Sequence, residues 1–416
     1  MPSVEGVGPR RAALQMLDAV LRRGQKLDAA ASRIQGLAAP DAGLALAISG
    51  ETLRRLPDLD SLIDSATRQR LPDDSKARMV LRIALAQKIA LETPDHAVVA
   101  TALPLVDGGP RRLVHGVLGT LLRRGLPRLD SPHLPLAVEE RWRNAWGVDV
   151  VEAARREIPQ RPPLDLTFAE DGDAQAYARQ HGEVSLASRH VRLASASVAD
   201  LPGYESGRWW VQDLAASLPA RLIPAEAAEV LDLCAAPGGK TMQLAAAGHR
   251  VTAVDASESR LGRLRDNLQR TRLDAQLVIA DALGWEPAHK FDAVLLDAPC
   301  SATGTFRRHP EVLYRARPSV IAGNSELQAK LLDRAAMWVK PGGTLVYSVC
   351  SLEPQEGEKV IRAFLGRNSE FSAHAPFELP LKLPSCSEGQ VRILPGLLEA
   401  EGGLDGFFIA RLVRKG

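Results

Sequence analysis

Two cysteines and one aspartate lie where the sequence predicts that neighbouring strands end. Cys300 closes the run Asp297-Ala-Pro-Cys, and Cys350 follows the apolar run that ends in Tyr347-Ser-Val. If these strands are adjacent and parallel, both thiols lie beside Asp297 at one edge of a sheet. A thiolate is a strong nucleophile, and a carboxylate next to it can hold a substrate or exchange a proton. The pattern therefore indicates covalent catalysis, although the spacing does not tell which thiol attacks.

A glycine-rich turn, VLDLCAAPGGKT at residues 230–241, precedes these thiols in the chain. Such a turn between a strand and a helix lets a ligand approach the backbone, with the N-terminus of the helix facing it. The spacing fits neither the GxGxxG fingerprint nor the P-loop, because Cys234 stands where the P-loop has its first glycine. This departure disfavours a nicotinamide dehydrogenase.

Three aspartates close the apolar runs that follow the turn, namely Asp255, Asp281 and Asp297. Asp255 follows Gly238 at close to the ~20 residues that separate a glycine-rich turn from the acid that holds a ribose. One such aspartate is often only a helix cap. Three of them in register at the carboxyl edge of a sheet indicate a nucleoside-containing cofactor.

The elements that must position these residues alternate between strand and helix. Near-continuous apolar runs predict buried strands, and the amphipathic stretches between them predict helices. The predicted strands are residues 230–233, 251–254, 277–280, 293–296 and 344–349, and the predicted helices are 240–247, 257–271 and 326–339. This alternation predicts an α/β domain over residues 223–416, with a parallel sheet covered on both faces.

The first 130 residues have a different pattern. Apolar residues recur at helical spacing, without β-branched alternation, in residues 10–34, 44–55, 75–91, 95–106 and 111–124. They predict an all-α bundle over residues 1–130. The proline-rich stretch at 126–135 is typical of a linker. Residues 131–222 predict this linker and a small α/β connecting domain, with strands at 164–168 and 209–211 and a helix at 173–181.

Composition excludes several classes of protein. The 416 residues are 45% hydrophobic and 25% charged, which is typical of a globular protein of two or three domains and not of a disordered chain. The four cysteines form no CxxC pair, which disfavours a zinc ribbon and a disulfide scaffold and favours a reducing compartment. No apolar run approaches the ~18 residues of a membrane helix, and the N-terminus lacks the apolar core of a signal peptide. We expect a cytoplasmic protein without metal or membrane contact, in which Cys234 and Cys386 are small buried side chains.

Positive charge is concentrated in the first part of the chain. The whole sequence carries a net charge of +2, whereas residues 1–130 hold 19 Lys/Arg against 14 Asp/Glu. Arginines come in pairs there, at 10–11, 22–23, 54–55, 111–112 and 123–124. Such pairs contact phosphates in some proteins and form a solvated helix face in others, and the charge alone leaves both open. For Arg307, Arg308 and His309, which follow the Pro-Cys loop, contact with phosphates and a solvated loop are likewise both left open.

The ordered motifs identify a family. VLDLCAAPGGKT, VTAVDAS, VIADA, LLDAPCSATGTFRRHPEV and LVYSVCSLEPQEGE resemble those of the RNA 5-methylcytosine methyltransferases of the bacterial RsmB (Sun/Fmu) type, which modify 16S ribosomal RNA. The resemblance implies a class I, Rossmann-like S-adenosylmethionine fold over residues 223–416. It implies that the methionine part of the cofactor is held by Cys234, Ala235, Ala236, Pro237, Gly238, Gly239 and Lys240. It further implies that Asp255 holds the ribose with Arg260 one helical turn beyond, that Asp281 holds the adenine, and that Lys240 bridges the cofactor loop and the catalytic loop at Asp297.

The same resemblance implies roles for the two thiols. C5 of cytosine is a poor nucleophile until a thiolate adds to C6, and the adduct must later lose the C5 proton. DNA cytosine methyltransferases use the Pro-Cys thiol, whereas the RNA family uses the thiol after the fifth strand. By this resemblance Cys350 is the nucleophile, Cys300 assists breakdown of the adduct, and Asp297 contacts the base near N3.

The first domain is similar to the NusB RNA-binding fold. The resemblance rests on SGETLRRLPDLDSLI, DHAVVATALPLV and RRLVHGVLGTLLRR, in which His115 replaces the asparagine common before Gly-Val-Leu. The middle segment resembles the connecting domain of the family and ends in WWVQDLAAS, where Trp209 and Trp210 are expected in the core rather than stacked on bases. We expect a monomer that acts on small-subunit ribosomal RNA. Transfer RNA as the substrate, or a non-catalytic assembly factor that binds RNA, are the alternatives.

Overall fold

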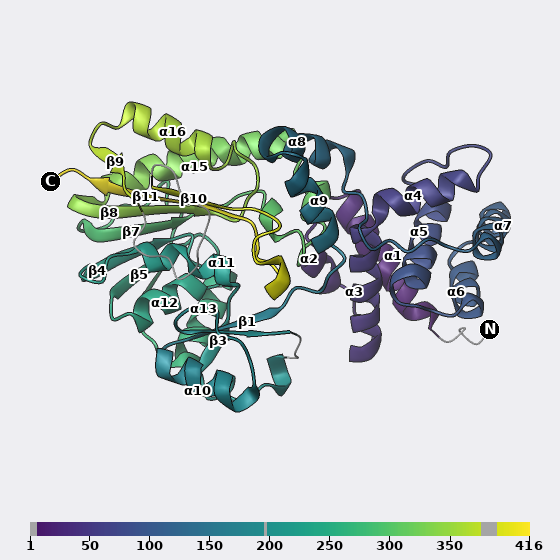
Figure 1. The fold of residues 1–416 in the computed structure, drawn as a ribbon, viewed down its shortest axis with the longest axis horizontal. Helices are drawn as coiled ribbons and strands as arrows, with labels where there is room; N and C mark the ends of the chain where they lie inside the picture. Colours follow the sequence, from purple (N-terminus) through teal and green to yellow (C-terminus); the bar gives the residue numbers. More distant parts are fainter. Residues whose placement is uncertain (1–5, 195–197, 376–388) are drawn as a thin grey trace. The chain divides into compact units, whose positions relative to one another are not determined.

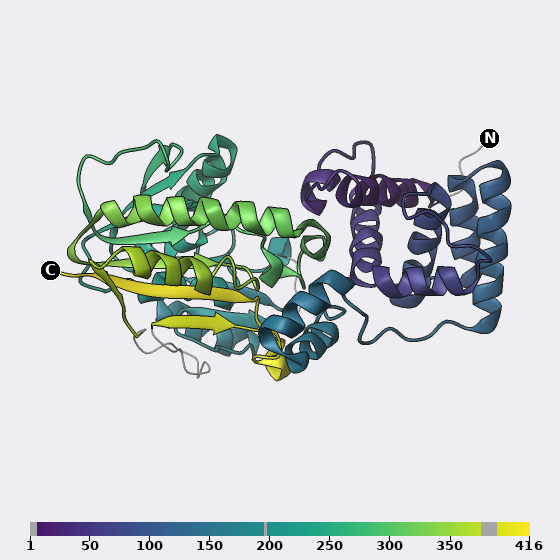
Figure 2. The same cartoon turned by 90° about the horizontal axis from the view of Figure 1, so that it is seen from above.

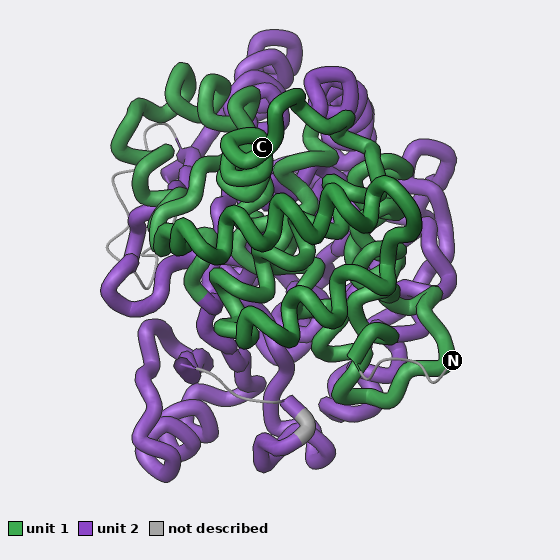
Figure 3. The backbone as a smooth tube through the Cα atoms, turned by 90° about the vertical axis from the view of Figure 1, so that its right-hand side faces the viewer, with its two compact units in different colours: residues 1–160, 306–316 green, residues 161–305, 317–416 purple. Residues whose placement is uncertain are grey.

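The computed structural model describes residues 6–194, 198–375 and 389–416 (Figure 1). The chain forms two compact units, which Figure 3 shows in two colours. Unit 1 comprises Met1–Gln160 and Phe306–Ala316, and unit 2 comprises Arg161–Thr305 and Arg317–Gly416. This division by contacts differs from the three sequence segments 1–130, 131–222 and 223–416, because residues 131–160 and 306–316 pack with the first unit. Cys386 lies outside the described residues.

Unit 1 is helical, as the sequence predicts. Its helices are α1 (Val7–Leu21), α2 (Leu27–Ala31), α3 (Ala39–Arg54), α4 (Leu56–Ser65), α5 (Lys76–Ala90), α6 (Asp95–Ala102), α7 (Gly108–Arg124), α8 (Leu136–Trp146) and α9 (Val148–Glu157). Helix α5 contacts α1, α3, α4, α6 and α7, and its residues from Ala77 to Gln87 are all buried. Arg78 on this helix is fully buried because Asp60 and Asp64 of α4 pair with its guanidinium. Helices α4, α8 and α9 are not among the predicted helices.

The segment Phe306–Ala316, which contains α14 (Val312–Arg315), is held by the helices of unit 1. The Phe306 ring packs edge-on against Trp142 at 5.6 Å between centroids. The Tyr314 hydroxyl donates to the Leu53 carbonyl at 2.7 Å, and Glu311 accepts from the backbone N–H of Leu27. Arg307 is only 2% exposed, so it belongs to this packing and is not a solvated loop residue.

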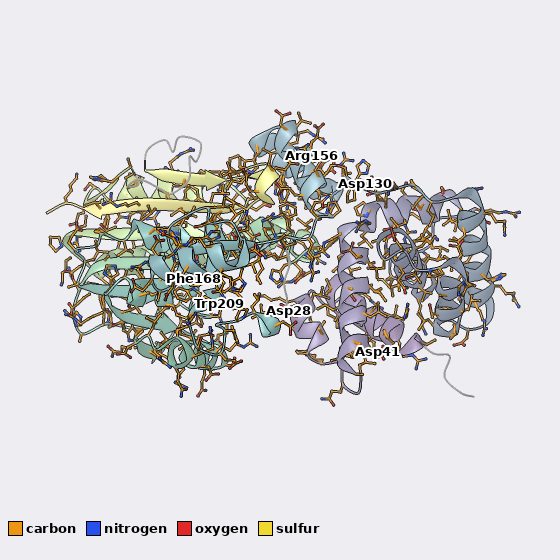
Figure 4. All side chains as sticks on the ribbon, turned by 60° about the horizontal axis from the view of Figure 1, so that its bottom comes forward. Asp28, Asp41, Asp130, Arg156, Phe168 and Trp209 are labelled. Atoms are coloured by element: carbon orange, nitrogen blue, oxygen red, sulfur yellow. The ribbon has the colours of Figure 1, made fainter. Side chains whose placement is uncertain are left out.

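Unit 2 contains a small antiparallel sheet in the order β2-β1-β3, formed by β1 (Leu164–Phe168), β2 (His190–Leu193) and β3 (Trp209–Val211). Helix α10 (Asp171–His181) packs on β1 and β2. Phe168 and Trp209, labelled in Figure 4, pair in register on this sheet and are buried. Trp210 is also buried, with its indole N–H donating to Gln212. Both tryptophans are therefore core residues, as the sequence favours.

The large sheet of unit 2 has the strand order β10-β11-β8-β7-β4-β5-β6. Five strands are parallel, as predicted, namely β4 (Glu229–Leu233), β5 (Arg250–Asp255), β6 (Gln276–Ile279), β7 (Phe291–Asp297) and β8 (Val339–Val349). Three further strands are antiparallel and were not predicted, namely β9 (Phe371–Ala373), β10 (Gln390–Ile393) and β11 (Phe407–Arg414). They extend the sheet beyond β8, so β8 is an internal strand paired on both sides.

Helices cover both faces of this sheet (Figures 1 and 2). Helices α15 (Pro318–Met337) and α16 (Glu358–Arg367) lie on one face, and α11 (Leu214–Ser217), α12 (Gly239–Ala246) and α13 (Glu258–Thr271) lie on the other. Short 3-10 turns complete the structure at Leu103–Leu105, Val198–Asp200, Pro219–Leu222, Thr303–Thr305 and Glu399–Glu401. The carboxyl ends of β4, β5, β7 and β8 therefore meet at one edge, where open α/β sheets bind ligands. In the described part of the chain, no helix has the length and apolar character needed to span a bilayer.

Candidate active site

The glycine-rich turn leaves β4 at Leu233 and enters α12. Cys234 has a φ of 60° and Gly238 a φ of 108°, and Ala235, Ala236 and Pro237 lie between them. A Cβ on Gly238 would lie 2.1 Å from the Leu264 side chain of α13. Glycine at 238 is thus required both by the left-handed backbone and by the close approach of α13.

Asp255 and Arg260, which the sequence pairs with this turn, contact each other. One carboxylate oxygen of Asp255 accepts from Arg260 and from the Ser257 N–H, each at 2.8 Å, and the other accepts from the Ala236 N–H at 3.2 Å. Asp255 is 2% exposed, so the end of β5 and the turn after β4 form one packed edge. A carboxylate has about four acceptor positions, which leaves room for one further donor.

Asp281 follows β6 by two residues and is exposed. Its carboxylate accepts from the Leu283 N–H at 3.0 Å, and its carbonyl accepts from Gly284 and Trp285. These bonds fix a turn that leaves part of the carboxylate open to a ligand. The three acids expected at the carboxyl edge are all present there, at the ends of β5 and β7 and just after β6.

Lys240 joins the turn to the neighbouring strand end at Asp297. Its Nζ donates to Asp297 Oδ2 at 2.7 Å, and Ser348 of β8 donates to Asp297 Oδ1 at 2.8 Å. Lys240 is 8% exposed and also lies 5.3 Å from the centroid of the Phe407 ring. The bridge that the sequence resemblance implies between the two loops is thus a direct ion pair.

The two thiols expected beside Asp297 lie next to each other. The Sγ atoms of Cys300 and Cys350 are 3.5 Å apart, since β7 and β8 are adjacent and parallel with Asp297 opposite Ser348. The hydrogen bond with Cys350 and burial raise the pKa of Cys300 well above its usual value, and the charges of Cys350 and Glu356 act in the same direction. Cys300 therefore keeps its proton at neutral pH.

Cys234 is a different kind of cysteine. Burial and the nearby carboxylates of Asp255 and Asp297 raise the pKa of its thiol to about 12. The thiolate is the reactive form, so Cys234 is inert at neutral pH and contributes packing and backbone to the turn.

Two buried carboxylates near the site carry no role in the sequence interpretation. Asp232 on β4 accepts from Thr241 at 2.6 Å, and burial raises its pKa to about 7. Glu356, in the turn after Cys350, is fully buried and accepts hydrogen bonds from Ser301, Ser351 and Asn324. The sequence places Glu356 six residues after Cys350, which could have drawn attention to it. That spacing does not reveal its hydrogen bonds to Ser301, which lies in a distant part of the sequence.

The residues at this edge fit S-adenosylmethionine. The turn at 234–240 approaches α13 so closely that only glycine is tolerated at 238, and it presents the N-terminus of α12. Asp255 has an acceptor position left, and the Asp281 carboxylate is exposed. No group of three or more His, Cys, Asp or Glu suited to a metal ion occurs among the described residues.

Comparison with known proteins gives two family matches. Residues 219–413 match the family described as 16S rRNA methyltransferase RsmB/F, and residues 8–123 match the NusB family. Two relatives named ribosomal RNA small subunit methyltransferase B are similar over nearly their whole length. That of Xanthomonas campestris pv. campestris is 35% identical over 435 residues, with 98% of both chains covered. That of Erwinia tasmaniensis is 32% identical over 440 residues, with 97% of this chain and 98% of its own covered.

The fold is also found among solved structures. The crystal structure of PH0851 covers 99% of both chains with a TM-score of 0.74 at 24% sequence identity. At that identity the likeness concerns the fold alone. It includes the helical N-terminal part as well as the Rossmann-like part.

Proposed function

Because the chain belongs to the ribosomal RNA small subunit methyltransferase B family, with S-adenosylmethionine as its methyl donor, we propose that it methylates C5 of a cytosine in small-subunit ribosomal RNA. The observation that carries this proposal is the pair of thiols 3.5 Å apart at the strand edge that also holds Asp297 and Lys240. A methyltransferase that acts on a nitrogen or oxygen needs no thiol, whereas attack through C5 of a pyrimidine requires one.

In the proposed reaction, the Cys350 thiolate adds to C6 of the cytosine. An S–C6 bond forms, the C5–C6 double bond becomes a single bond, and C5 gains the electron density of an enamine. Asp297 contacts the base near N3, where charge accumulates. When bound, S-adenosylmethionine supplies an electrophilic methyl group on a sulfonium. After methylation, a base removes the C5 proton, the double bond re-forms, and Cys350 leaves as a thiolate.

The electrostatics of the thiol pair support Cys300 as the group that assists this last step. The largest influence that keeps Cys300 protonated is its contact with Cys350. Once Cys350 is bonded to C6, its sulfur is a thioether, so its hydrogen bond and its charge no longer raise the pKa of Cys300, whereas burial still does. Cys300 then gives its proton to water more easily and, as a thiolate, accepts the proton from C5. Formation of the adduct therefore prepares the base that resolves it.

The target base must leave its stack to reach two thiols at a sheet edge, as in other enzymes that modify a base. The decisive experiment is bisulfite mapping of ribosomal and transfer RNA from cells with and without the gene. A 5-methylcytosine in 16S ribosomal RNA that disappears with the gene supports the proposal. Loss of a site in transfer RNA only would assign the same chemistry to the other substrate, and loss of none would favour an assembly factor.

A further inference from the structure

The residues directly after the two catalytic cysteines are joined through one buried carboxylate. Ser301 donates to Glu356 twice, from its backbone N–H at 2.8 Å and from its hydroxyl at 2.5 Å. Ser351 donates its hydroxyl to the same carboxylate, and the two serine oxygens lie 3.2 Å apart. Glu356 and Ser351 are 0% exposed. Each thiol is therefore one residue away from a common anchor.

Glu356 is itself held from two other elements. Asn324 of α15 donates to Glu356 Oε1 at 2.9 Å, and the buried Tyr347 hydroxyl of β8 donates to the Glu356 carbonyl at 2.6 Å. Four hydrogen bonds to one carboxylate use about all its acceptor positions. A fully buried carboxylate is costly unless it is satisfied in this way, so the arrangement fixes its position.

The backbone between the two loops is tied in the same region. The Gly304 N–H donates to the Cys350 carbonyl at 3.0 Å, and Thr303 accepts from the Leu352 N–H at 2.9 Å. These two bonds attach the Pro-Cys loop to the loop after β8. The Glu356 carboxylate supplies the side-chain part of the same attachment, at the two positions next to the thiols.

We propose that Glu356 is a positioning residue that sets the spacing of the Cys300 and Cys350 thiols by holding Ser301 and Ser351. The inference rests on the proposed function for its catalytic meaning, but the spacing itself is a property of the folded chain. A displacement of about 1 Å at a reacting centre can cost on the order of a hundredfold in rate. The two thiols act in succession on one base, Cys350 at C6 and Cys300 at the C5 proton, so the distance between them must suit both steps.

The spacing can be measured without any reaction of the enzyme. Phenylarsine oxide bridges two neighbouring thiols, forming two S–As bonds and releasing one water. The full-length protein is incubated with this reagent and then treated with an excess of a monothiol, which removes arsenic that is not bound by two protein thiols. The mass of the protein is then measured by mass spectrometry. Wild type is expected to retain one arsenic, and Cys300→Ala and Cys350→Ala are expected to lose it. Glu356→Gln is expected to retain it at least tenfold less well, and retention equal to wild type would overturn the proposal.

A matched variant controls for the chemical change. Glu286→Gln makes the same substitution at an exposed glutamate that pairs with Arg334, and it is expected to retain the arsenic as wild type does. Should Glu356→Gln fail to fold, Ser301→Ala and Ser351→Ala each remove one attachment and leave the buried carboxylate in place. Both are expected to weaken retention, and the double variant more than either. Unchanged retention in the double variant would sink the proposal.

Methylation kinetics provide a second test of the role of Glu356. In Glu356→Gln, turnover on RNA is expected to fall about ten- to hundredfold while KM for RNA changes less than twofold, because the carboxylate does not touch substrate. A change confined to KM would contradict positioning. If wild type makes no 5-methylcytosine, the proposed function fails, whereas the arsenic measurement still decides the role of Glu356.

Discussion

Lys240 Nζ lies 2.7 Å from Asp297 Oδ2, so a residue in the first turn of α12 is bonded to the carboxyl end of β7. The pair connects the turn expected to hold the cofactor with the strand end expected to hold the base. Lys240 is buried, so the loss of one partner would leave a poorly solvated charge and is more costly than at a surface salt bridge.

Replacing Lys240 is therefore expected to affect both binding steps. Lys240→Met leaves Asp297 without its cation and is expected to weaken S-adenosylmethionine binding and lower turnover at least tenfold. Calorimetry and a methylation assay measure the two effects. Lys340→Met is the matched control, because Lys340 also lies 2.7 Å from an aspartate, Asp292, while its own side chain is 40% exposed against 10% for Lys240. Equal effects of the two variants would show that the Lys240 pair has no special role.

The two cysteine variants are expected to differ in what accumulates. Cys350→Ala cannot form the S–C6 bond, so neither methylated RNA nor a covalent complex is expected. Cys300→Ala is expected to form the adduct and fail to release it, leaving RNA bound to protein on a denaturing gel. The rates alone do not discriminate, because residues that act as a unit give non-additive effects. A trapped complex in Cys350→Ala but not in Cys300→Ala would make Cys300 the nucleophile.

Asp255→Ala is expected to weaken S-adenosylmethionine binding by about 2 kcal/mol, the scale of a charged hydrogen bond, or roughly thirtyfold in Kd. The loss also releases the Ala236 N–H that Asp255 holds in the turn. Calorimetry gives the Kd. Asp266→Ala, at an exposed position on α13, removes the same charge and serves as the control. An unchanged Kd in Asp255→Ala would remove this residue from the cofactor site.

Capture of RNA is expected to depend on arginines of α7. Among the arginine pairs of the first domain, Arg111 and Arg112 are exposed, and their side chains make no hydrogen bond or ion pair within the described residues. Arg123 is exposed on the same helix. Changing all three to glutamine is expected to weaken RNA binding and to reduce the salt dependence by about 2 in slope. Filter binding at several salt concentrations measures both.

The control for this prediction removes the same charge elsewhere in unit 1. Arg22 and Arg23 pair with Asp18, and Arg33 bonds to Gln25. Changing these three to glutamine is expected to alter the salt slope less. If both triple variants behave alike, RNA responds to total charge and α7 is not the contact surface.

Asp232 makes the stability of the protein depend on pH. Its pKa is raised to about 7 in the folded chain, by burial above all, from 3.8 in the unfolded chain. The folded state therefore binds the extra proton between these values, and stability falls as pH rises from about 4 to about 7. At most, on the order of 4 kcal/mol is lost above pH 7 through this group. Denaturant unfolding of Asp232→Asn is expected to show a flatter profile over this range, and an unchanged slope would contradict the assignment.

The ends of the parallel strands were predictable from the sequence, whereas the antiparallel strands and the long-range hydrogen bonds were not. Strands β4, β5, β7 and β8 lie inside the sheet and contain runs of buried apolar residues, and Asp255 and Asp297 mark where β5 and β7 end. Strand β6 lies at the edge of the sheet and is only partly buried. Helix α4 was missed although its buried residues Leu56, Leu59 and Ile63 recur at helical spacing, because it follows α3 directly and has Pro57 in its first turn. Strands β9 and β10 were missed because they have only three and four residues. Strand β11 was missed although it has eight residues, because no predicted helix precedes it to mark another strand–helix repeat. The role inferred for Glu356 depends on hydrogen bonds across more than fifty residues, which no local pattern encodes.

The membership of Phe306–Ala316 in unit 1 has a consequence for how the chain is made. A ribosome delivers the chain from the N-terminus, and N-terminal domains generally fold first. Trp142 lacks its partner Phe306, and Leu53 lacks its partner Tyr314, until these residues have been synthesised. By then more than half of unit 2, residues 161–305, has already been synthesised. A nascent chain that pauses before Phe306 carries a bundle with open packing positions. The unit that is begun first is thus completed late, and its final assembly waits for a downstream part of the message to be translated.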